Sequence, residues 1–223
     1  MSDTIDLDAI SERLKSSYNN QFVCDHTTSM VVEGFPRSSN TFTVDFLFML
    51  SQRGGQNMKL AHHTHDAEND LLGHGLKIPC VVLLRSPVAA ISSYMIYSGV
   101  DATTAVSRYI QFYKAVRPIK NKVLIAPFET LTTDFNAFVS AVNARFVFNI
   151  PLSEDLKADE ETAKNMERER GARIYGEEHY ASRVAVPNDE RKAMAKSVKE
   201  EVSKMLENRP QAINLYNLLS GQA

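Results

Sequence analysis

The sequence has little cysteine and no long uninterrupted apolar stretch. Among its 223 residues there are two cysteines, Cys24 and Cys80. Cys80 lies in an apolar run that is typical of a buried strand, so we expect no disulfide framework and a reducing cytoplasmic setting. The most apolar segment, residues 81–100, is interrupted by Arg85 and Pro87. It therefore falls short of a membrane span.

An excess of charge of one sign is also missing. The 25 Lys and Arg residues nearly balance 27 Asp and Glu residues, which gives a net charge of −2. This balance provides no general attraction to nucleic acid or to an anionic membrane, so an anion site would have to be local. The N-terminal segment is acidic where a secretory signal would be basic and then apolar, and we therefore expect no export signal.

Internal repeats, low-complexity tracts and long Gly, Ser or Pro linkers are absent as well. Hydrophobic residues make up 43% of the chain, which is enough for one substantial core. We therefore expect a single domain over residues 1–223, whose C-terminal portion, from about residue 153, is helical.

Short apolar runs bounded by Gly, Pro or polar residues predict strands. These runs span residues 30–34, 58–63, 80–84 and 123–127. Segments with helical spacing of apolar residues span residues 41–52, 101–117 and 133–146, and charged, helix-forming stretches span residues 154–170 and 188–208. Alternation of strand and helix predicts a doubly wound α/β fold, with a mostly parallel sheet and helices on both faces. Ligands of such sheets bind beyond the carboxyl ends of the strands.

Small polar residues follow the first predicted strand and precede a helix. They are Gly34, Phe35, Pro36, Arg37, Ser38, Ser39, Asn40 and Thr41. In such a turn backbone N–H groups converge on an anion, and the positive end of the helix dipole faces it. The nucleoside triphosphatase string Gly-x-x-x-x-Gly-Lys-Ser/Thr is absent. The motif alone predicts either a phosphate cradle or a polar turn capped by Ser or Asn.

A second polar group follows the third predicted strand. Arg85 ends this strand, Pro87 suits the first turn of a helix, and Ser93 lies about two helical turns further on. The Ser93 hydroxyl can then face the guanidinium of Arg85, which suits a phosphate monoester. In isolation, the favoured explanation of the pattern is an Arg that closes a sheet edge and a Ser within a helix.

Three histidines crowd the end of the second predicted strand. Strand alternation places His63 and His65 on one face and His62 on the other. Such a group indicates a metal site, a general base with a neighbour, or a polar strand end. The general base is favoured because no third cluster of metal ligands occurs elsewhere in the sequence.

The three motifs, in this order, resemble those of sulfotransferases that use 3′-phosphoadenosine 5′-phosphosulfate (PAPS). Pro36, Arg37, Ser38 and Thr41 match the 5′-phosphosulfate loop of that family, while Ser39 replaces its usual Gly. Arg-x-Pro followed by Ser93 looks like its 3′-phosphate motif. His63-Thr64-His65 is similar to its Lys-Thr-His string, with His63 at the Lys position.

The resemblance covers residues 29–147 and is closest to small bacterial sulfotransferase-like proteins. These share paired histidines, a Tyr-Ile-x-Phe-Tyr helix like residues 109–113 and an Asn-x-Arg-Phe string like residues 143–146. Residues 123–138 resemble the strand, Glu-x-Leu and helix that follow in the family.

The resemblance implies a P-loop-like fold and transfer of a sulfuryl group from PAPS to a hydroxyl or amine, with 3′,5′-adenosine bisphosphate (PAP) as product and without a metal. It implies catalytic roles for His65 as base, for His63 as its helper and for Arg37 at the leaving phosphate oxygen. The nucleotide-binding residues would be Arg37, Ser38, Ser39, Asn40, Thr41, Phe42, Arg85 and Ser93. Phe42 is expected near the adenine or in the core.

The C-terminal third resembles the family least. Its candidates for a contact to the 3′-phosphate are Arg173, Arg183, Arg191 and Lys192. The expected acceptor is a small molecule or a glycan, and no nucleic acid or membrane partner is expected. The identity of the acceptor and the oligomeric state of the protein stay open.

Three other functions compete with this prediction. A P-loop kinase would need a Lys-Ser/Thr pair in the loop and a Mg²⁺-binding Asp at a strand end, and neither is found. A non-catalytic nucleotide-binding module stays open, as does a metal-dependent hydrolase built on the His-x-His pair.

Overall fold

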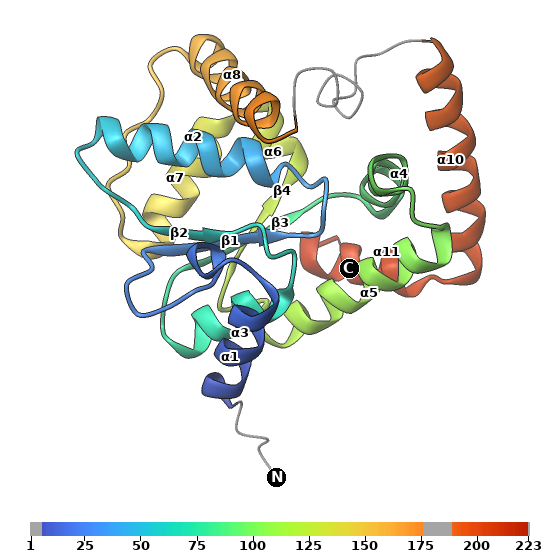
Figure 1. The fold of residues 1–223 in the computed structure, drawn as a ribbon, viewed down its shortest axis with the longest axis horizontal. Coiled ribbons are helices and arrows are strands. Elements are labelled where there is room, and N and C mark those ends of the chain that lie inside the picture. The colour runs from blue at the N-terminus through green and yellow to red at the C-terminus, as the bar shows by residue number, and fades with distance from the viewer. Residues whose placement is uncertain (1–5, 176–188, 223) are drawn as a thin grey trace.

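A four-stranded parallel sheet forms the centre of the computed structural model, which describes residues 6–175 and 189–222 (Figure 1). Its strands are β1 (Met30–Gly34), β2 (Leu60–His62), β3 (Cys80–Leu84) and β4 (Leu124–Pro127), in the order β2-β1-β3-β4. All three neighbouring pairs are parallel, so the four carboxyl ends lie at one edge of the sheet.

Helices connect and follow the strands. They are α1 (Leu7–Ser17), α2 (Asn40–Arg53), α3 (Ala67–Gly75), α4 (Pro87–Ser98), α5 (Ala102–Val116), α6 (Phe128–Thr133), α7 (Phe135–Phe146), α8 (Leu156–Tyr175), α10 (Asp189–Asn208) and α11 (Gln211–Ser220). Two 3₁₀ turns are η1 (Asn20–Phe22) and η2 (Arg117–Ile119).

The sheet separates two hydrophobic cores, because successive strand side chains point to opposite faces. Val31 of β1 and Val82 of β3 belong to the core that α1, α3, α4, α5, α10 and α11 cover. Val32 and Val81 belong to the core of α2, α7 and α8 on the other face, as Figure 1 shows. The predicted doubly wound α/β fold is therefore confirmed.

Most predicted elements are confirmed within a few residues, and the differences have local causes. β1 and β3 have the predicted bounds, and Asp101 caps α5 by accepting from the Thr104 N–H at 3.0 Å. The predicted strand 58–63 is shorter, since His63 leaves it with a positive φ of 61°. The predicted helix 133–146 begins later, because Asp134 caps α7 by accepting a hydrogen bond from the Ala137 N–H.

After residue 153 the described chain is helical, as predicted, with α8, α10 and α11. Of the C-terminal candidates, Arg173 is exposed on α8, whereas Arg183 and the side chains of Arg191 and Lys192 lie outside what the structure describes. No described helix combines the length and the apolar character that crossing a bilayer requires.

Candidate functional site

The first two polar motifs begin side by side because β1 and β3 pair closely. Gly34, the last residue of β1, is opposite Leu83. A Cβ atom at Gly34 would lie 2.8 Å from the Leu83 Cβ and 2.9 Å from its carbonyl oxygen. Any side chain here would push the strands apart, so glycine allows the loop after β1 to start against the end of β3.

The turn between β1 and α2, which we call the β1 turn (Phe35–Ser39), has two residues in the left-handed region. Arg37 has φ 69° and Ser39 has φ 74°. Ser39 occupies the position at which the resembled loop has glycine, a residue that adopts this conformation without steric cost. The Asn40 side chain donates from Nδ2 to the Phe35 carbonyl at 3.2 Å and braces the turn.

Arg37, Arg85 and Ser93 meet at this turn. The Arg85 Nη1 donates to the Arg37 carbonyl at 2.7 Å, and the Arg37 Nε donates to the Ser93 Oγ at 3.2 Å. The sequence predicted Ser93 as the neighbour of the Arg85 guanidinium, but the recorded partner of its hydroxyl is Arg37. As the Ser93 oxygen accepts this bond, its own hydrogen stays available for an anion.

Both guanidinium groups are held in partly desolvated positions. Burial, followed by the nearby positive charge of Arg37, lowers the pKa of Arg85. The Arg85 guanidinium lies 4.0 Å from the Phe128 ring centroid, and its buried Nε has no hydrogen-bond partner. The Tyr109 hydroxyl fixes the strand end by donating to the Arg85 carbonyl at 2.8 Å. Two neighbouring cations at this turn favour an anion.

The structure corrects the expected roles of several loop residues. Ser38 is fully buried and Asn40 is 5% exposed, so neither side chain is presented to a ligand, and Asn40 braces the turn from inside. Phe42 packs edge-to-face on Phe46 and Phe135, with ring centroids 5.5 and 5.7 Å away, and so serves the core. Ser39 and Thr41 stay partly exposed.

His63 and His65 lie in the turn after β2, the β2 turn (His63–Asp66), and the predicted alternation of faces is wrong. His63 and His65 have φ 61° and 51°, so the chain is no longer extended where they lie. The His63 ring centroid lies 4.6 Å from that of His62 and 5.8 Å from that of His65. All three imidazoles therefore gather in one place.

Glu33 holds the β2 turn, and its role was not predicted from the sequence. The fully buried carboxylate accepts from the Thr64 N–H at 2.9 Å, from the Thr64 hydroxyl at 2.7 Å and from the His65 N–H at 3.0 Å. Asn69 of α3 adds a fourth bond at 3.0 Å. Burial raises the pKa of Glu33, whereas the proximity of His65 and the hydrogen bonds from Thr64 and Asn69 oppose that rise. The one available signal was an acidic residue inside an apolar strand.

His63 has both ring nitrogens engaged. Its Nδ1 lies 2.5 Å from the His62 Nδ1, and its Nε2 lies 3.0 Å from the Thr41 Oγ1. Burial lowers the pKa of His63 to about 2 and that of His62 to about 4. Both rings are therefore neutral near pH 7, and neither nitrogen of His63 is free to take a proton from a substrate.

His65 differs from His63 in having a free basic nitrogen. Its Nδ1 lies 2.9 Å from the Gly34 carbonyl oxygen. A carbonyl only accepts, so Nδ1 must carry the hydrogen, and in the neutral imidazole Nε2 then has the lone pair. Within residues 6–175 and 189–222 no hydrogen bond uses this nitrogen. His65 therefore has the geometry of a general base, the role that the resemblance implies for it.

Two cavities adjoin the histidines, and both are lined by His63, His65 and Tyr97. The first, the Phe48 cavity, has a volume of about 730 Å³ and includes Thr41 and Phe48. The second, the Arg37 cavity, has a volume of about 760 Å³ and is lined also by Pro36, Tyr94 and Arg108. Both volumes suit small-molecule ligands.

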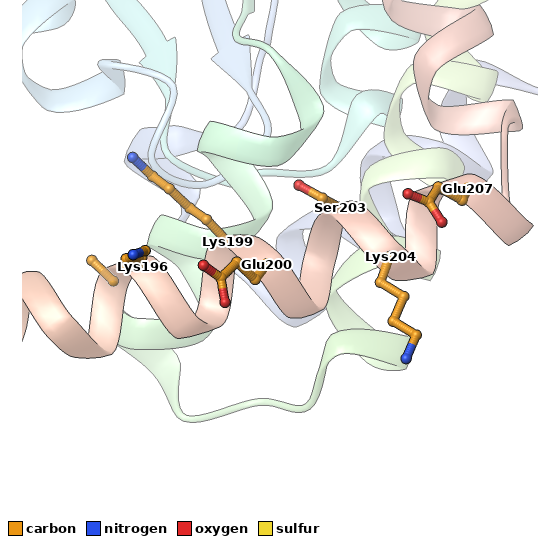
Figure 2. Close-up of a pocket in the computed structure, with 7 residues that line it drawn as sticks. Lys196, Lys199, Glu200, Ser203, Lys204 and Glu207 are labelled. Atoms are coloured by element: carbon orange, nitrogen blue, oxygen red, sulfur yellow. The ribbon is translucent and has the colours of Figure 1, made fainter.

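A third hollow, of about 730 Å³, lies far from the strand ends. Figure 2 shows that its lining comes from α10 alone. The lining side chains are Ala195, Lys196, Lys199, Glu200, Ser203, Lys204 and Glu207. Acidic and basic groups alternate on this exposed helix face, which is typical of a solvated surface.

Among residues 6–175 and 189–222, no three His, Cys, Asp or Glu side chains are grouped so that they could hold a metal ion. Comparison of the chain with protein-family models, with curated proteins and with solved structures finds no match. The function is therefore argued from the geometry of the site.

Proposed function

We propose that this protein transfers a sulfuryl group from PAPS to an acceptor hydroxyl or amine. The observation that carries the proposal is the meeting of Arg37, Arg85 and Ser93 at adjacent strand ends, next to His65. With His65, these residues come from three separate motifs. The hydrogen bonds from Arg37 to Ser93 and from Arg85 to Arg37 join the ends of β1 and β3. A nucleotide with phosphates at both its 5′ and 3′ positions needs two such neighbouring anion sites.

The 5′-phosphosulfate would bind at the β1 turn. Asn40 and Arg85 tie down the carbonyl oxygens of Phe35 and Arg37, and neither brace consumes a backbone N–H. N–H groups of residues 37–41 and the N-terminus of α2 are then suited to hold the anion. Arg37 would stabilise the charge that develops on the leaving phosphate oxygen.

The 3′-phosphate would bind at Arg85 and Ser93. The partly buried Arg85 offers a guanidinium with incomplete pairing, and Ser93 offers its hydroxyl hydrogen. Since ATP has no 3′-phosphate, this second site would select PAPS over ATP.

His65 would act as the base. Its Nε2 takes the proton of the acceptor hydroxyl as the acceptor oxygen forms a bond to sulfur. The bond between sulfur and the bridging phosphate oxygen breaks with its electron pair, so PAP leaves and the sulfate ester remains. Cys24 and Cys80 are buried free thiols, a state compatible with the reducing cytoplasm that we propose as the setting.

Thermal unfolding with PAP or with ATP and Mg²⁺ tests the donor site. A ligand at 100 times its Kd adds about 2.7 kcal/mol to stability. For a chain of this length that energy raises the Tm by about 5–10 °C. We expect this rise with PAP and not with ATP and Mg²⁺.

Arg85→Gln should abolish the rise with PAP, while Arg117→Gln, a change at an exposed arginine of η2, should leave it intact. Absence of stabilisation by PAP, or equal stabilisation by ATP and Mg²⁺, would contradict the donor assignment. Transfer of ³⁵S from labelled PAPS to a panel of acceptors then separates an enzyme from a module that only binds the nucleotide.

A further inference from the structure

The Phe48 cavity has an apolar wall. Five of its lining residues are hydrophobic and come from η1, α2, β2 and the residues before β2. They are Phe22, Val44, Phe48, Met58 and Leu60. Because apolar surface favours apolar ligand surface, this wall suits the body of an alkyl or aromatic compound.

One ion pair lies among these side chains. Asp45 of α2 accepts a hydrogen bond from the Arg170 guanidinium of α8, and both residues line the cavity. The Asp45 side chain is 4% exposed and that of Arg170 is 41% exposed. The second carboxylate oxygen, Oδ2, is buried and has no hydrogen-bond partner among the residues that the structure describes. The pair supplies a free acceptor atom whose negative charge is already compensated.

The neighbouring imidazoles add no charge. His62 and His63 also line the cavity, and burial holds both in the neutral form near pH 7. The charges of Asp45 and Arg170 cancel. Apart from His65, the residues that line the cavity therefore have no net charge. A charged ligand would lose its hydration here without gaining an opposite charge.

We propose that the Phe48 cavity binds the acceptor, that this acceptor is an uncharged alcohol with an apolar body and a second hydrogen-bond donor, and that the Asp45–Arg170 pair determines this specificity. The inference rests on the proposed function. The reacting hydroxyl lies at His65, the body packs on Phe48 and Met58, and the second donor reaches the Asp45 Oδ2. An ammonium group would be repelled by Arg170, and a carboxylate would be repelled by Asp45.

Three phenols that differ at one end test the charge preference. They are 4-(2-hydroxyethyl)phenol, which is neutral, tyramine, which is a cation, and 4-hydroxyphenylacetate, which is an anion. Affinities are measured by ligand-observed NMR titration, with and without PAP. We expect the neutral phenol to bind at least about tenfold more tightly than either ion, a ratio equal to about 1.4 kcal/mol. Equal affinities, or a preference for an ion, overturn the proposal.

Arg170→Gln tests the role of the ion pair. This change leaves the Asp45 carboxylate uncompensated, so the preference should move from the neutral phenol to tyramine. Arg168→Gln is the matched control, because Arg168 is on the same helix with a side chain that is 60% exposed and does not line the cavity. An unchanged preference in Arg170→Gln shows that the pair does not determine specificity.

Phe48→Ala tests the cavity itself. We expect the neutral phenol to bind about tenfold more weakly, since part of its apolar contact is lost. Phe146→Ala, at another partly buried phenylalanine that does not line the cavity, should leave the affinity unchanged. Equal effects of the two changes overturn the assignment of the cavity.

The two proposals fail in different ways. The affinities of the phenols measured without PAP test the Phe48 cavity even if PAP does not bind. Failure of PAP to bind would contradict only the proposed donor site. Stabilisation by PAP together with no preference for the neutral phenol overturns only the inference on the acceptor.

Discussion

The β1 turn and the β2 turn have similar backbones and opposite hydrogen-bond braces. Each has two left-handed residues separated by one, Arg37 and Ser39 in the first, His63 and His65 in the second. In each turn the residue between them is a buried hydroxyl residue. Local conformation therefore does not distinguish the two turns.

The braces distinguish them. In the β1 turn Asn40 and Arg85 donate to carbonyl oxygens, so the braces leave backbone N–H groups for an anion. In the β2 turn Glu33 accepts from the N–H groups of Thr64 and His65. The second turn is thereby unsuited to an anion and instead presents imidazole rings. The comparison teaches that the polarity of the brace, rather than the shape of the turn, decides what each turn can bind.

The largest expected effect separates the two histidines of the β2 turn. His65→Ala removes the ring of the β2 turn whose Nε2 has no hydrogen-bond partner among the described residues, so sulfuryl transfer should fall by about 10²–10⁴-fold. His63→Ala should cost less than about tenfold, because this ring only supports its neighbours. Initial rates with labelled PAPS measure both, and stabilisation by PAP serves as the control for folding and donor binding. A large loss in His63→Ala with none in His65→Ala would reverse the assignment.

An intermediate effect is expected when the brace of the β2 turn is altered. In Glu33→Gln one carboxylate oxygen becomes an NH₂ group that faces other donors, so the turn loses hydrogen bonds at a cost of about 1–3 kcal/mol. We expect a lower Tm and a kcat reduced by about tenfold or more, equal to about 1.4 kcal/mol, while the KM for PAPS is unchanged.

Thr64→Val provides a graded comparison, because it removes the hydroxyl bond to Glu33 and keeps the backbone bond. Its effect on kcat should be smaller than that of Glu33→Gln. If the KM for PAPS changed and kcat did not, Glu33 would support the β1 turn rather than position His65.

The smallest expected effect concerns the backbone of the β1 turn. Ser39 has φ 74°, and glycine adopts this conformation without steric cost. Ser39→Gly should therefore raise stability by up to about 1 kcal/mol, which corresponds to about 2–4 °C in Tm. Ser203→Gly, at an exposed position inside α10, should instead lower stability by about 0.5 kcal/mol. A loss of stability in Ser39→Gly would show that the serine side chain supports the turn.

Much of the architecture could be predicted from the sequence, because strand periodicity and the polar residues after each strand are local signals. β1 and β3 were predicted with their bounds, and parallel pairing necessarily brings their ends to one edge. At this edge the Arg85 guanidinium donates to the Arg37 carbonyl oxygen.

Partners distant in sequence could not be predicted in the same way. Glu33 binds residues 31 and 32 positions away, and Arg170 reaches Asp45 across 125 positions. The packing of turns and helices likewise decides three other features. They are the partner of Ser93, the contact of His62 with His63 and the core position of Phe42.

The sequence by itself determined the order of strands and helices, the two buried faces of the sheet and the placement of polar residues after β1, β2 and β3, since these follow from periodicity and chain connectivity. The tertiary structure decided which histidine keeps a free nitrogen and which turn keeps its N–H groups. The physical reason is that a hydrogen bond engages the N–H group or the imidazole lone pair that it uses, and the partners in these bonds come from residues that only the fold brings near.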